Sequence, residues 1–322
     1  MRRPYIWFAL CRYCVKIKTP IILILLFFEK NQMMIKQFLT VVSLSVIVSN
    51  TTSAQYYHKD IISIKQANDD KKLMEKGKVR RVIIHSFEAD GSPSEGFKCE
   101  KNISKNYKEV ETSTMSTGTT PSVLLSYYND AAQLIKSSDS SEVTAASTVY
   151  EYDEKGNIKS ITAYNHSSDD DFSTSLKEVH QYTYNENNKP VKMLRIKNDK
   201  DTLQIDFVID AKGNVTDEIE KTAGGKHYYY YYNDLNQLTD IVRYNVVKKA
   251  MRPDFVFEYN SAGLVSQMVA VEEGIPGSYY NEKDAANYYT WRYFYNDEGL
   301  RIIEKCYNNQ GKLQGYFEYE YE

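Results

Sequence analysis

The side chains that could support catalysis are few and scattered in this 322-residue sequence. The five histidines form no pair at a metal-ligand spacing such as H-x-x-x-H, and none lies near a cysteine; they are His58, His85, His166, His180 and His227. The sequence has no G-x-S-x-G nucleophile motif, phosphate-binding glycine loop or zinc signature. We therefore expect no catalytic residues, no enzymatic activity, no cofactor and no metal; an exported hydrolase is a third hypothesis.

One acidic cluster could attract a hard cation, because such cations prefer oxygen ligands. It comprises Asp169, Asp170 and Asp171. The cluster lacks the alternating oxygen ligands and the sixth-position glycine of a calcium loop. The pattern is typical of a solvated acidic loop.

Aromatic residues are the stronger signal. The sequence has 29 Tyr against 12 Phe and 2 Trp, and HYYYYYNDLNQL (227 to 238) places five tyrosines in a row before a polar run. Tyrosine suits a half-buried strand, with the ring packed and the hydroxyl in water. The composition therefore favours β structure. The strands that carry the rings must set the spacing between them.

Those strands belong to a repeat. Six anchor positions recur 23 to 36 residues apart, at Tyr152, Tyr184, Ile209, Tyr232, Tyr259 and Tyr295. Two residues before each anchor the residue is aromatic, one after it is Asp or Asn, and four after it is Gly or Asn. Self-similarity at this period indicates a repeat architecture. Degraded copies occur at Tyr127-Tyr128, at Phe87 and at Tyr307.

Each recurring position has a physical reason. Asp or Asn can accept a backbone hydrogen bond and open a type I turn. Gly or Asn three residues later tolerates positive φ, as a hairpin with a G1 bulge requires. Aromatics two residues apart lie on one face of a strand. The unit is therefore a strand, a tight turn and a second strand. In the first clear copy the first strand spans 149 to 153, the turn 154 to 156 and the second strand 158 to 164.

The candidate ligand-binding residues are the rings on the opposite face, which is otherwise mainly polar. They are Tyr229, Tyr231 and Phe294. Flat rings beside carboxylates and amides suit a glycan, and tyrosine is also enriched at protein interfaces. A purely structural packing role is the third interpretation. Trp291 is in register with Tyr293 and Tyr295, so we expect it in the packed stripe.

The stretch YEYDEKGNI (150 to 158) resembles the YD repeat, also called the RHS repeat, and the looser copies extend this similarity over residues 123 to 322. The chain is most similar to the small secreted bacterial members of that family. The resemblance implies a secreted or wall-associated repeat protein and does not define a ligand. The chain lacks the size and toxin tail of the shell-forming members.

The N-terminal sequence predicts export. From Met34 a basic start is followed by an apolar stretch and the small-residue site Thr52-Ser53-Ala54, the layout of a signal peptide cleaved near Ala54-Gln55. A short membrane anchor is the alternative. Residues 1–33 are interpreted as an upstream mis-start extension, so Cys11 and Cys14 form no redox motif. The product would lie in the periplasm, at the cell surface or outside the cell.

Cleavage would leave an acidic chain. The first 54 residues carry seven basic residues and one acidic residue, so the remainder has 33 basic and 42 acidic residues and a net charge near −9. Nucleic acid and anionic membranes are therefore poor partners. Cys99 and Cys306 remain, either as one disulfide or as two buried thiols.

We expect an all-β fold: an array of β-hairpin repeats that forms an extended twisted antiparallel sheet, either open or curled into a partial barrel. A propeller is the rival. Residues 55–122 should form an N-terminal cap region, with a strand near 79 to 87 and a Ser/Thr-rich linker at 111 to 122, and residues 123–322 the repeat domain.

The leading functional hypothesis is a secreted or cell-surface non-enzymatic binding protein for a glycan or protein ligand, without stable membrane insertion of the mature chain. The alternative is a structural scaffold or partner subunit of an envelope assembly.

Overall fold

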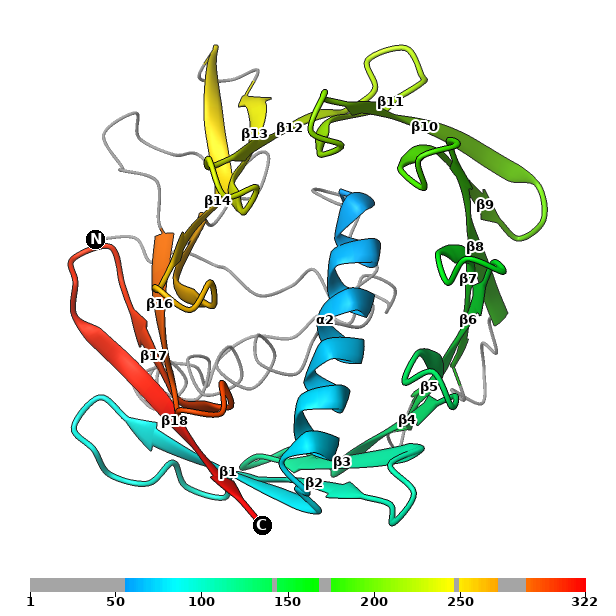
Figure 1. Ribbon diagram of the computed structural model, residues 1–322. Helices are drawn as coiled ribbons and strands as arrows, with labels where there is room; N and C mark the ends of the chain where they lie inside the picture. Colours follow the sequence, from blue (N-terminus) through cyan, green and yellow to red (C-terminus); the bar gives the residue numbers. More distant parts are fainter. Residues whose placement is uncertain (1–55, 141–143, 168–174, 246–248, 272–287) are drawn as a thin grey trace, which may run out of the picture.

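The strands form one antiparallel sheet that closes on itself as a barrel (Figure 1). The computed structural model describes residues 56–140, 144–167, 175–245, 249–271 and 288–322. Each strand pairs with its successor, and β1 closes the ring by pairing with both β2 and β18. The predicted all-β hairpin array is confirmed. Closure leaves no sheet edge exposed, and one continuous sheet excludes the propeller.

The described residues contain one helix and 18 strands. They are α2 (His58–Lys76), β1 (Arg81–Glu88), β2 (Lys98–Ile103), β3 (Glu109–Met115), β4 (Ser122–Tyr128), β5 (Leu134–Ser140), β6 (Thr144–Tyr152), β7 (Ile158–Ser167), β8 (Ser175–Tyr184), β9 (Pro190–Lys197), β10 (Asp201–Ile209), β11 (Val215–Glu220), β12 (His227–Tyr232), β13 (Leu238–Asn245), β14 (Ala250–Tyr259), β15 (Val265–Val271), β16 (Tyr288–Tyr295), β17 (Arg301–Tyr307) and β18 (Leu313–Tyr321).

The repeat turns have the predicted chemistry. In the first copy the Asp153 side chain accepts hydrogen bonds from the backbone N–H groups of Lys155 and Asn157. The Gly156 N–H donates to the Asp153 carbonyl, and Gly156 has φ +82°. The register shifts between Glu151 and Tyr152, as a bulge requires. The other five copies also have positive φ at this position, at Asn188, Gly213, Asn236, Gly263 and Gly299.

The anchor tyrosines join each hairpin to the preceding one. Each hydroxyl donates to the carbonyl of the first residue of the second strand in the preceding hairpin. The six bonds are 2.6 to 2.9 Å long: Tyr152 to Leu134, Tyr184 to Ile158, Tyr232 to Val215, Tyr259 to Leu238, Tyr295 to Val265 and Tyr321 to Arg301. Ile209 occupies the same place and has no hydroxyl. The anchor is therefore a connector between repeats as well as a packed ring.

The aromatic residue two before the anchor points into the barrel, and in two hairpins its hydroxyl donates to a carboxylate on the preceding strand. Tyr230 donates to Glu218 at 2.8 Å, and Tyr319 donates to Glu304 at 3.0 Å. Where the corresponding neighbour is an apolar residue, Met193 or Ile241, the ring is a phenylalanine, Phe207 or Phe257. The neighbours at the same position beside Tyr182 and Tyr293, Ile161 and Met268, are also apolar. The neighbouring residue alone therefore does not decide between Tyr and Phe.

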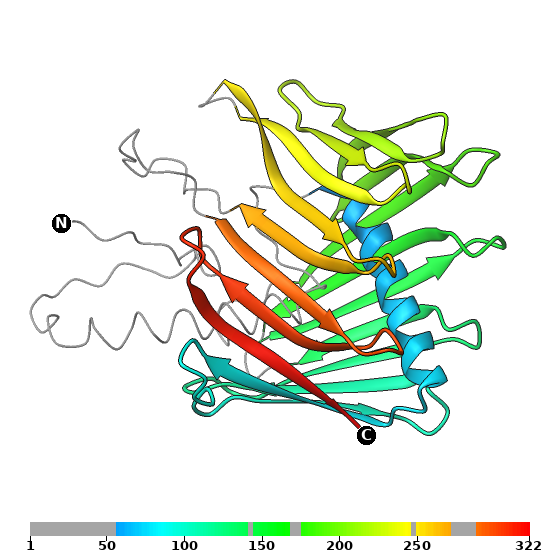
Figure 2. The same cartoon turned by 60° about the vertical axis from the view of Figure 1, so that its left-hand side comes forward.

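Helix α2 crosses the inside of the barrel at the rim formed by the short repeat turns (Figures 1 and 2). Its sequence has good helix formers, no Gly or Pro, and the i,i+4 ion pairs Lys65–Asp69 and Lys71–Glu75. It ends at Gly77, whose N–H donates to the Leu73 carbonyl. With 19 residues the helix is roughly 28 Å long, enough to reach from β11 and β12 to the β1–β3 wall.

The helix corrects the expectation for residues 55–122. The strand near 79 to 87 is confirmed as β1, but 58 to 76 form α2, and residues 111–115 of the predicted linker lie in β3. Strands β1 to β3 belong to the same sheet as the repeats. The polar residues of α2 lie on most sides of the helix. Its sequence therefore lacks the amphipathic period that marks a surface helix. The signal peptide and the residues before it lie outside the described residues.

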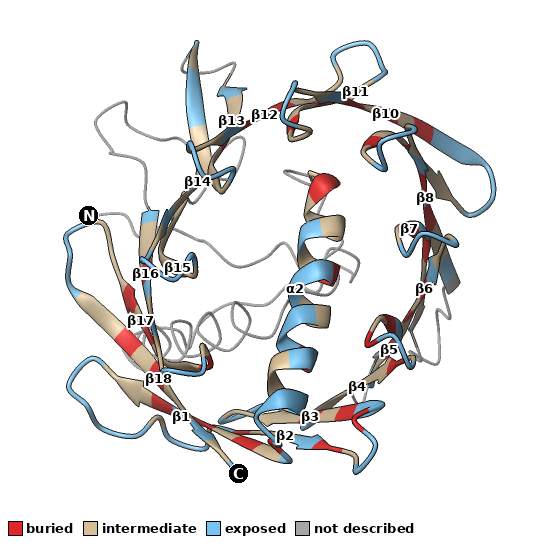
Figure 3. Ribbon diagram, in the orientation of Figure 1, coloured by how far each residue is buried: buried red, intermediate tan, exposed pale blue. Residues whose placement is uncertain are grey.

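Most strands of the wall carry buried residues, whereas the repeat turns are mainly exposed (Figure 3). Trp291 is 1% exposed, which confirms its place in the packed stripe. Cys99 and Cys306 are both buried free thiols, so the structure has no disulfide between them.

Candidate functional site

The first turn of α2 is held by a carboxylate of the barrel wall. Glu218 on β11 accepts the backbone N–H groups of Tyr57 at 2.7 Å and His58 at 2.8 Å, and the Tyr230 hydroxyl as a third donor. Tyr57 has no side-chain cap of its own, so Glu218 satisfies helix N–H groups that would otherwise lack partners. Burial raises the pKa of Glu218 to about 7, against the lowering effect of these three hydrogen bonds.

A second anchor joins α2 to β8. His180 lies between two carboxylates, with Nδ1 2.7 Å from Asp60 and Nε2 2.8 Å from Glu178. Burial alone would lower the pKa of His180, but the charge of Asp60 and the hydrogen bonds to both acids raise it to about 9. Burial would raise the pKa of Glu178, yet His180 and Lys197 lower it to about 2. The histidine is therefore an imidazolium that donates to both acids.

These buried groups hold the helix in place. The Tyr182 hydroxyl donates to the Tyr57 carbonyl and to Asp60, and Arg195 donates to the Tyr57 hydroxyl. Burial lowers the pKa of His58 to about 4, so this ring is neutral against Tyr230. Glu218, Asp60, His180 and Glu178 all have hydrogen-bond partners in the protein, which is the arrangement of a packed junction between helix and wall. The buried His58 Nδ1 and Arg195 Nε have no hydrogen-bond partner among the described residues.

The predicted ligand-binding residues do lie on the outer face. Tyr228 and Tyr230 point inward, so the alternation of the strand directs Tyr229 and Tyr231 outward. Tyr231 is 51% exposed and Phe294 is 44% exposed. Tyr229 is only partly exposed, because its ring stacks on His227 with centroids 4.0 Å apart.

The structure does not bring the three residues together. Tyr229 and Tyr231 lie on β12 and Phe294 on β16, with β13, β14 and β15 between them. Four strand spacings separate the two groups by about 19 Å. A single small ligand cannot contact both.

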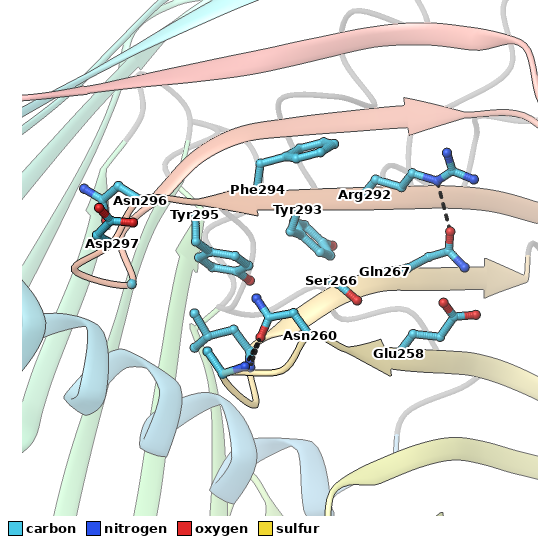
Figure 4. Close-up of a pocket in the computed structure, with 13 residues that line it drawn as sticks. Glu258, Asn260, Ser266, Gln267, Arg292, Tyr293, Phe294, Tyr295, Asn296 and Asp297 are labelled. Carbon is cyan, nitrogen blue, oxygen red and sulfur yellow. Dashed lines mark hydrogen bonds between the residues drawn. The ribbon is translucent and has the colours of Figure 1, made fainter.

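Phe294 lines a pocket between β16 and the β14–β15 hairpin (Figure 4). Pairing of β15 with β16 begins at Gln267 and Arg292, so the strands are unpaired on the side toward the turn. The pocket volume is about 580 Å³. It is lined by Glu258, Asn260, Ala262, Leu264, Ser266, Gln267, Arg292, Tyr293, Phe294, Tyr295, Asn296, Asp297 and Gly299.

The pocket combines rings with many polar groups. Figure 4 shows Tyr293 and Tyr295 on the side of β16 that faces the hairpin, and Arg292 bonded to Gln267. The Arg292 Nε donates to the Gln267 Oε1 at 3.1 Å. The lining contains three amides, two carboxylates, one guanidinium and three aromatic residues. Phe294 is on the outer face of β16, and Tyr293 and Tyr295 are on its inner face. Rings supply apolar contact area, and the amides and acids supply donors and acceptors, a combination suited to a ligand rich in hydroxyl groups.

Sequence reasoning identified Phe294 but missed its polar neighbours. In the sequence, Glu258 is the polar residue equivalent to Phe294 in the preceding repeat. Glu258 lies directly before the anchor Tyr259, as Phe294 lies directly before the anchor Tyr295. This match is the sequence signal that places both side chains on the same face. Asn260 and Asn296 were assigned to turns, and both turns border the pocket.

Asp169 to Asp171 lie outside the described residues. Within the residues that are described, no three His, Cys, Asp or Glu side chains are placed to hold a metal ion. The one described helix is not apolar enough to span a bilayer.

Comparison with known proteins yields weak structural likenesses. No family model and no curated protein matches the sequence. A porin-like protein from Bacteroides uniformis is similar at 10% identity and a TM-score of 0.37, over 76% of this chain and 98% of that chain. A porin-like protein from Bacteroides vulgatus is similar at 13% identity and a TM-score of 0.21, over 76% and 98%. The Tc holotoxin pore of Photorhabdus luminescens is similar at 12% identity and a TM-score of 0.28, over 71% of this chain and 15% of that one. These TM-scores are too low to carry an argument about function.

Proposed function

We propose that this protein is an exported, non-enzymatic binding protein that recognises a glycan at the outer pocket beside Phe294. The observation that supports this most directly is the pocket lining, which combines the exposed Phe294 ring with amides, carboxylates and Arg292. Two buried groups with shifted pKa values, Glu218 and His180, are bonded to α2. This favours a structural role for both groups.

The outer face of the barrel favours a position in water. A membrane barrel presents an apolar band to lipid. Here charged side chains lie on the outer face of at least eight of the 18 described strands. They are His85, Glu100, Asp217, Asp240, Glu258, Arg292, Lys305 and Glu318, on β1, β2, β11, β13, β14, β16, β17 and β18. Such a surface would be costly in a bilayer, which supports the expectation that the mature chain does not insert.

The hairpin unit supports a finer assignment, a YD-type repeat. The aspartate of YEYDEKGNI makes the turn-closing hydrogen bonds, and the preceding tyrosine connects neighbouring hairpins. The motif thus has a structural cause in every part. We propose a small secreted YD-repeat protein that leaves the cell through the signal peptide at 34–54.

The test is a glycan array followed by titration calorimetry with the purified protein. We expect Phe294→Ala to weaken the best glycan by tenfold or more, because the exposed ring supplies the main apolar contact. Tyr231→Ala is the matched control, since it removes an equally exposed ring about 19 Å away. The control should leave affinity unchanged.

Other outcomes would contradict the proposal. Loss of glycan binding in Tyr229→Ala/Tyr231→Ala with normal binding in Phe294→Ala would move the site to β12. No glycan signal together with stable co-purification of an envelope protein would favour the scaffold. Release of new reducing ends from a polysaccharide, abolished by a single Asp or Glu substitution, would make the protein a hydrolase.

A further inference from the structure

Two cations face each other across β16 and β17 on the outer wall. Arg292 and Lys305 are direct cross-strand partners. Both point outward, because Trp291, Glu304 and Cys306 beside them in the chain are buried on the inner side. Like charges directly opposite each other destabilise a sheet. The pair is therefore an unfavourable feature of the fold unless something else compensates it.

Within the described part of the chain, neither Arg292 nor Lys305 has a carboxylate partner within ion-pair distance. The contrast with β13 and β14 is informative. There Arg243 and Arg252 are also cross-strand partners, but Asp254 accepts from the Arg243 Nε at 2.8 Å. The Arg243–Arg252 pair thus has a carboxylate partner at Arg243, whereas the Arg292–Lys305 pair has none among the described residues.

Aromatic rings flank the two cations. The Lys305 Nζ lies 5.9 Å from the ring centroid of Phe294 and 5.6 Å from that of Tyr316. Tyr316 stacks on Phe87 of β1 with centroids 4.8 Å apart and planes 13° from parallel. The Arg292 guanidinium carbon lies 5.1 Å from the Tyr307 centroid. Each cation therefore lies over an aromatic ring, and the same rings could also contact an apolar surface of a ligand.

These residues form one continuous row across six strands. Following the registered partners from β1 to β14, the outer row consists of Phe87, Tyr316, Lys305, Arg292, Gln267 and Glu258. Its last three members line the pocket. Five strand spacings give the row a length of about 24 Å, which suits an extended chain lying across the strands.

We infer that the ligand of the outer pocket is an acidic polysaccharide, whose carboxylates bind between Arg292 and Lys305 while its sugar rings lie along the outer row from Glu258 toward Phe87. This inference rests on the proposed glycan-binding function and names its substrate class. An anion between the two cations would relieve their repulsion, and the rings on both sides would contact the apolar faces of neighbouring sugars.

The experiment compares two probes with the same backbone. Titration calorimetry with an oligogalacturonate and with its fully methyl-esterified form isolates the carboxylate. We expect the acidic form to bind at least tenfold more tightly, with an affinity that falls as salt increases. Arg292→Gln/Lys305→Gln should reduce its affinity at least tenfold. Lys136→Gln is the matched control, because Lys136 also lies over an outer ring, that of Tyr127, on β5.

A charge reversal separates binding from folding. Lys305→Glu converts the like-charge pair into an opposite-charge pair, so the Tm should rise or stay unchanged while binding of the acidic probe is abolished. A loss of binding in a variant of undiminished Tm cannot come from misfolding. Normal binding in this variant would overturn the inference.

The remaining outcomes distinguish the two proposals. Equal binding of the acidic and esterified probes would overturn the acidic class and leave the glycan-binding function standing. No binding of either probe or of any array glycan would overturn both. Binding of polyglutamate as tight as that of oligogalacturonate, and unaffected by Phe294→Ala, would replace the polysaccharide with an acidic peptide.

Discussion

The Tyr232 hydroxyl donates to the Val215 carbonyl at 2.9 Å, and this bond joins two hairpins where their strands are not yet paired. Tyr232→Phe removes the hydroxyl and keeps the ring. We expect the free energy of unfolding to fall by about 1 kcal/mol, because the partly buried carbonyl loses its donor. Urea denaturation measures it. An unchanged midpoint would mean that the ring alone joins the repeats.

The equivalent bond can be added at Ile209, the one anchor of the six original repeats without a hydroxyl. Ile209→Tyr should place a donor toward the carbonyl of Pro190, the first residue of β9. We expect a gain of about 1 kcal/mol over Ile209→Phe, which supplies the ring alone. Thermal unfolding of the two variants gives the comparison. Equal Tm values would show that the hydroxyl does not reach its acceptor.

Stability should depend on pH through Glu218. Its pKa in the folded protein is about 7, above its ordinary 4.5, so its stabilising contribution is complete below pH 4.5 and is lost as pH rises to 7. A difference of this size corresponds to a loss on the order of 3 kcal/mol. Glu218→Gln, which cannot ionise, should abolish the decline over this range. Urea denaturation at pH 5, 6, 7 and 8 measures it; parallel curves for both proteins would contradict the assignment.

His180 should produce a second decline at higher pH. Its pKa is raised from 6.5 to about 9, so the stability it contributes is complete below pH 6.5 and is lost as pH rises through 9. The decline should persist in Glu218→Gln and disappear in His180→Gln. NMR titration of the imidazole provides an independent measurement, and a midpoint near 6.5 would contradict the double ion pair.

The turn position four residues after the anchor can be tested in both directions. Ala132 has φ +59°, which strains a residue with a Cβ, so Ala132→Gly should stabilise the fold by up to about 1 kcal/mol. Gly311 has φ +72° and open space around an added Cβ. Gly311→Ala should therefore cost about 1 kcal/mol from backbone strain alone. Thermal unfolding gives both values, and two changes of the same sign would contradict the shared turn conformation.

The repeat turns could be predicted from the sequence because their causes are local. Asp153 and Gly156 lie within one turn, and the side-chain acceptor and the positive φ depend on neighbours a few residues away. The additional anchor Tyr321 keeps the aromatic residue two before it, Tyr319, but Glu322 follows it in place of Asp or Asn. Phe294 could be placed on the outer face because strand alternation is also local.

The helix and the pocket could not be predicted in this way. The sequence of α2 shows no apolar stripe, and its cap comes from Glu218, which is 161 residues from Tyr57. The polar partners of Phe294 come from a hairpin about 30 residues earlier, and their convergence depends on where β15 and β16 begin to pair.

The amino-acid sequence by itself determined the hairpin, its turn and the inward or outward direction of each ring, since these follow from backbone conformation and side-chain alternation. Only the tertiary structure decided that β1 meets β18, that α2 crosses the barrel, and that Arg292 is the cross-strand partner of Lys305. These relationships depend on how many hairpins fit around the ring and on the register between distant strands, and no short segment contains that information.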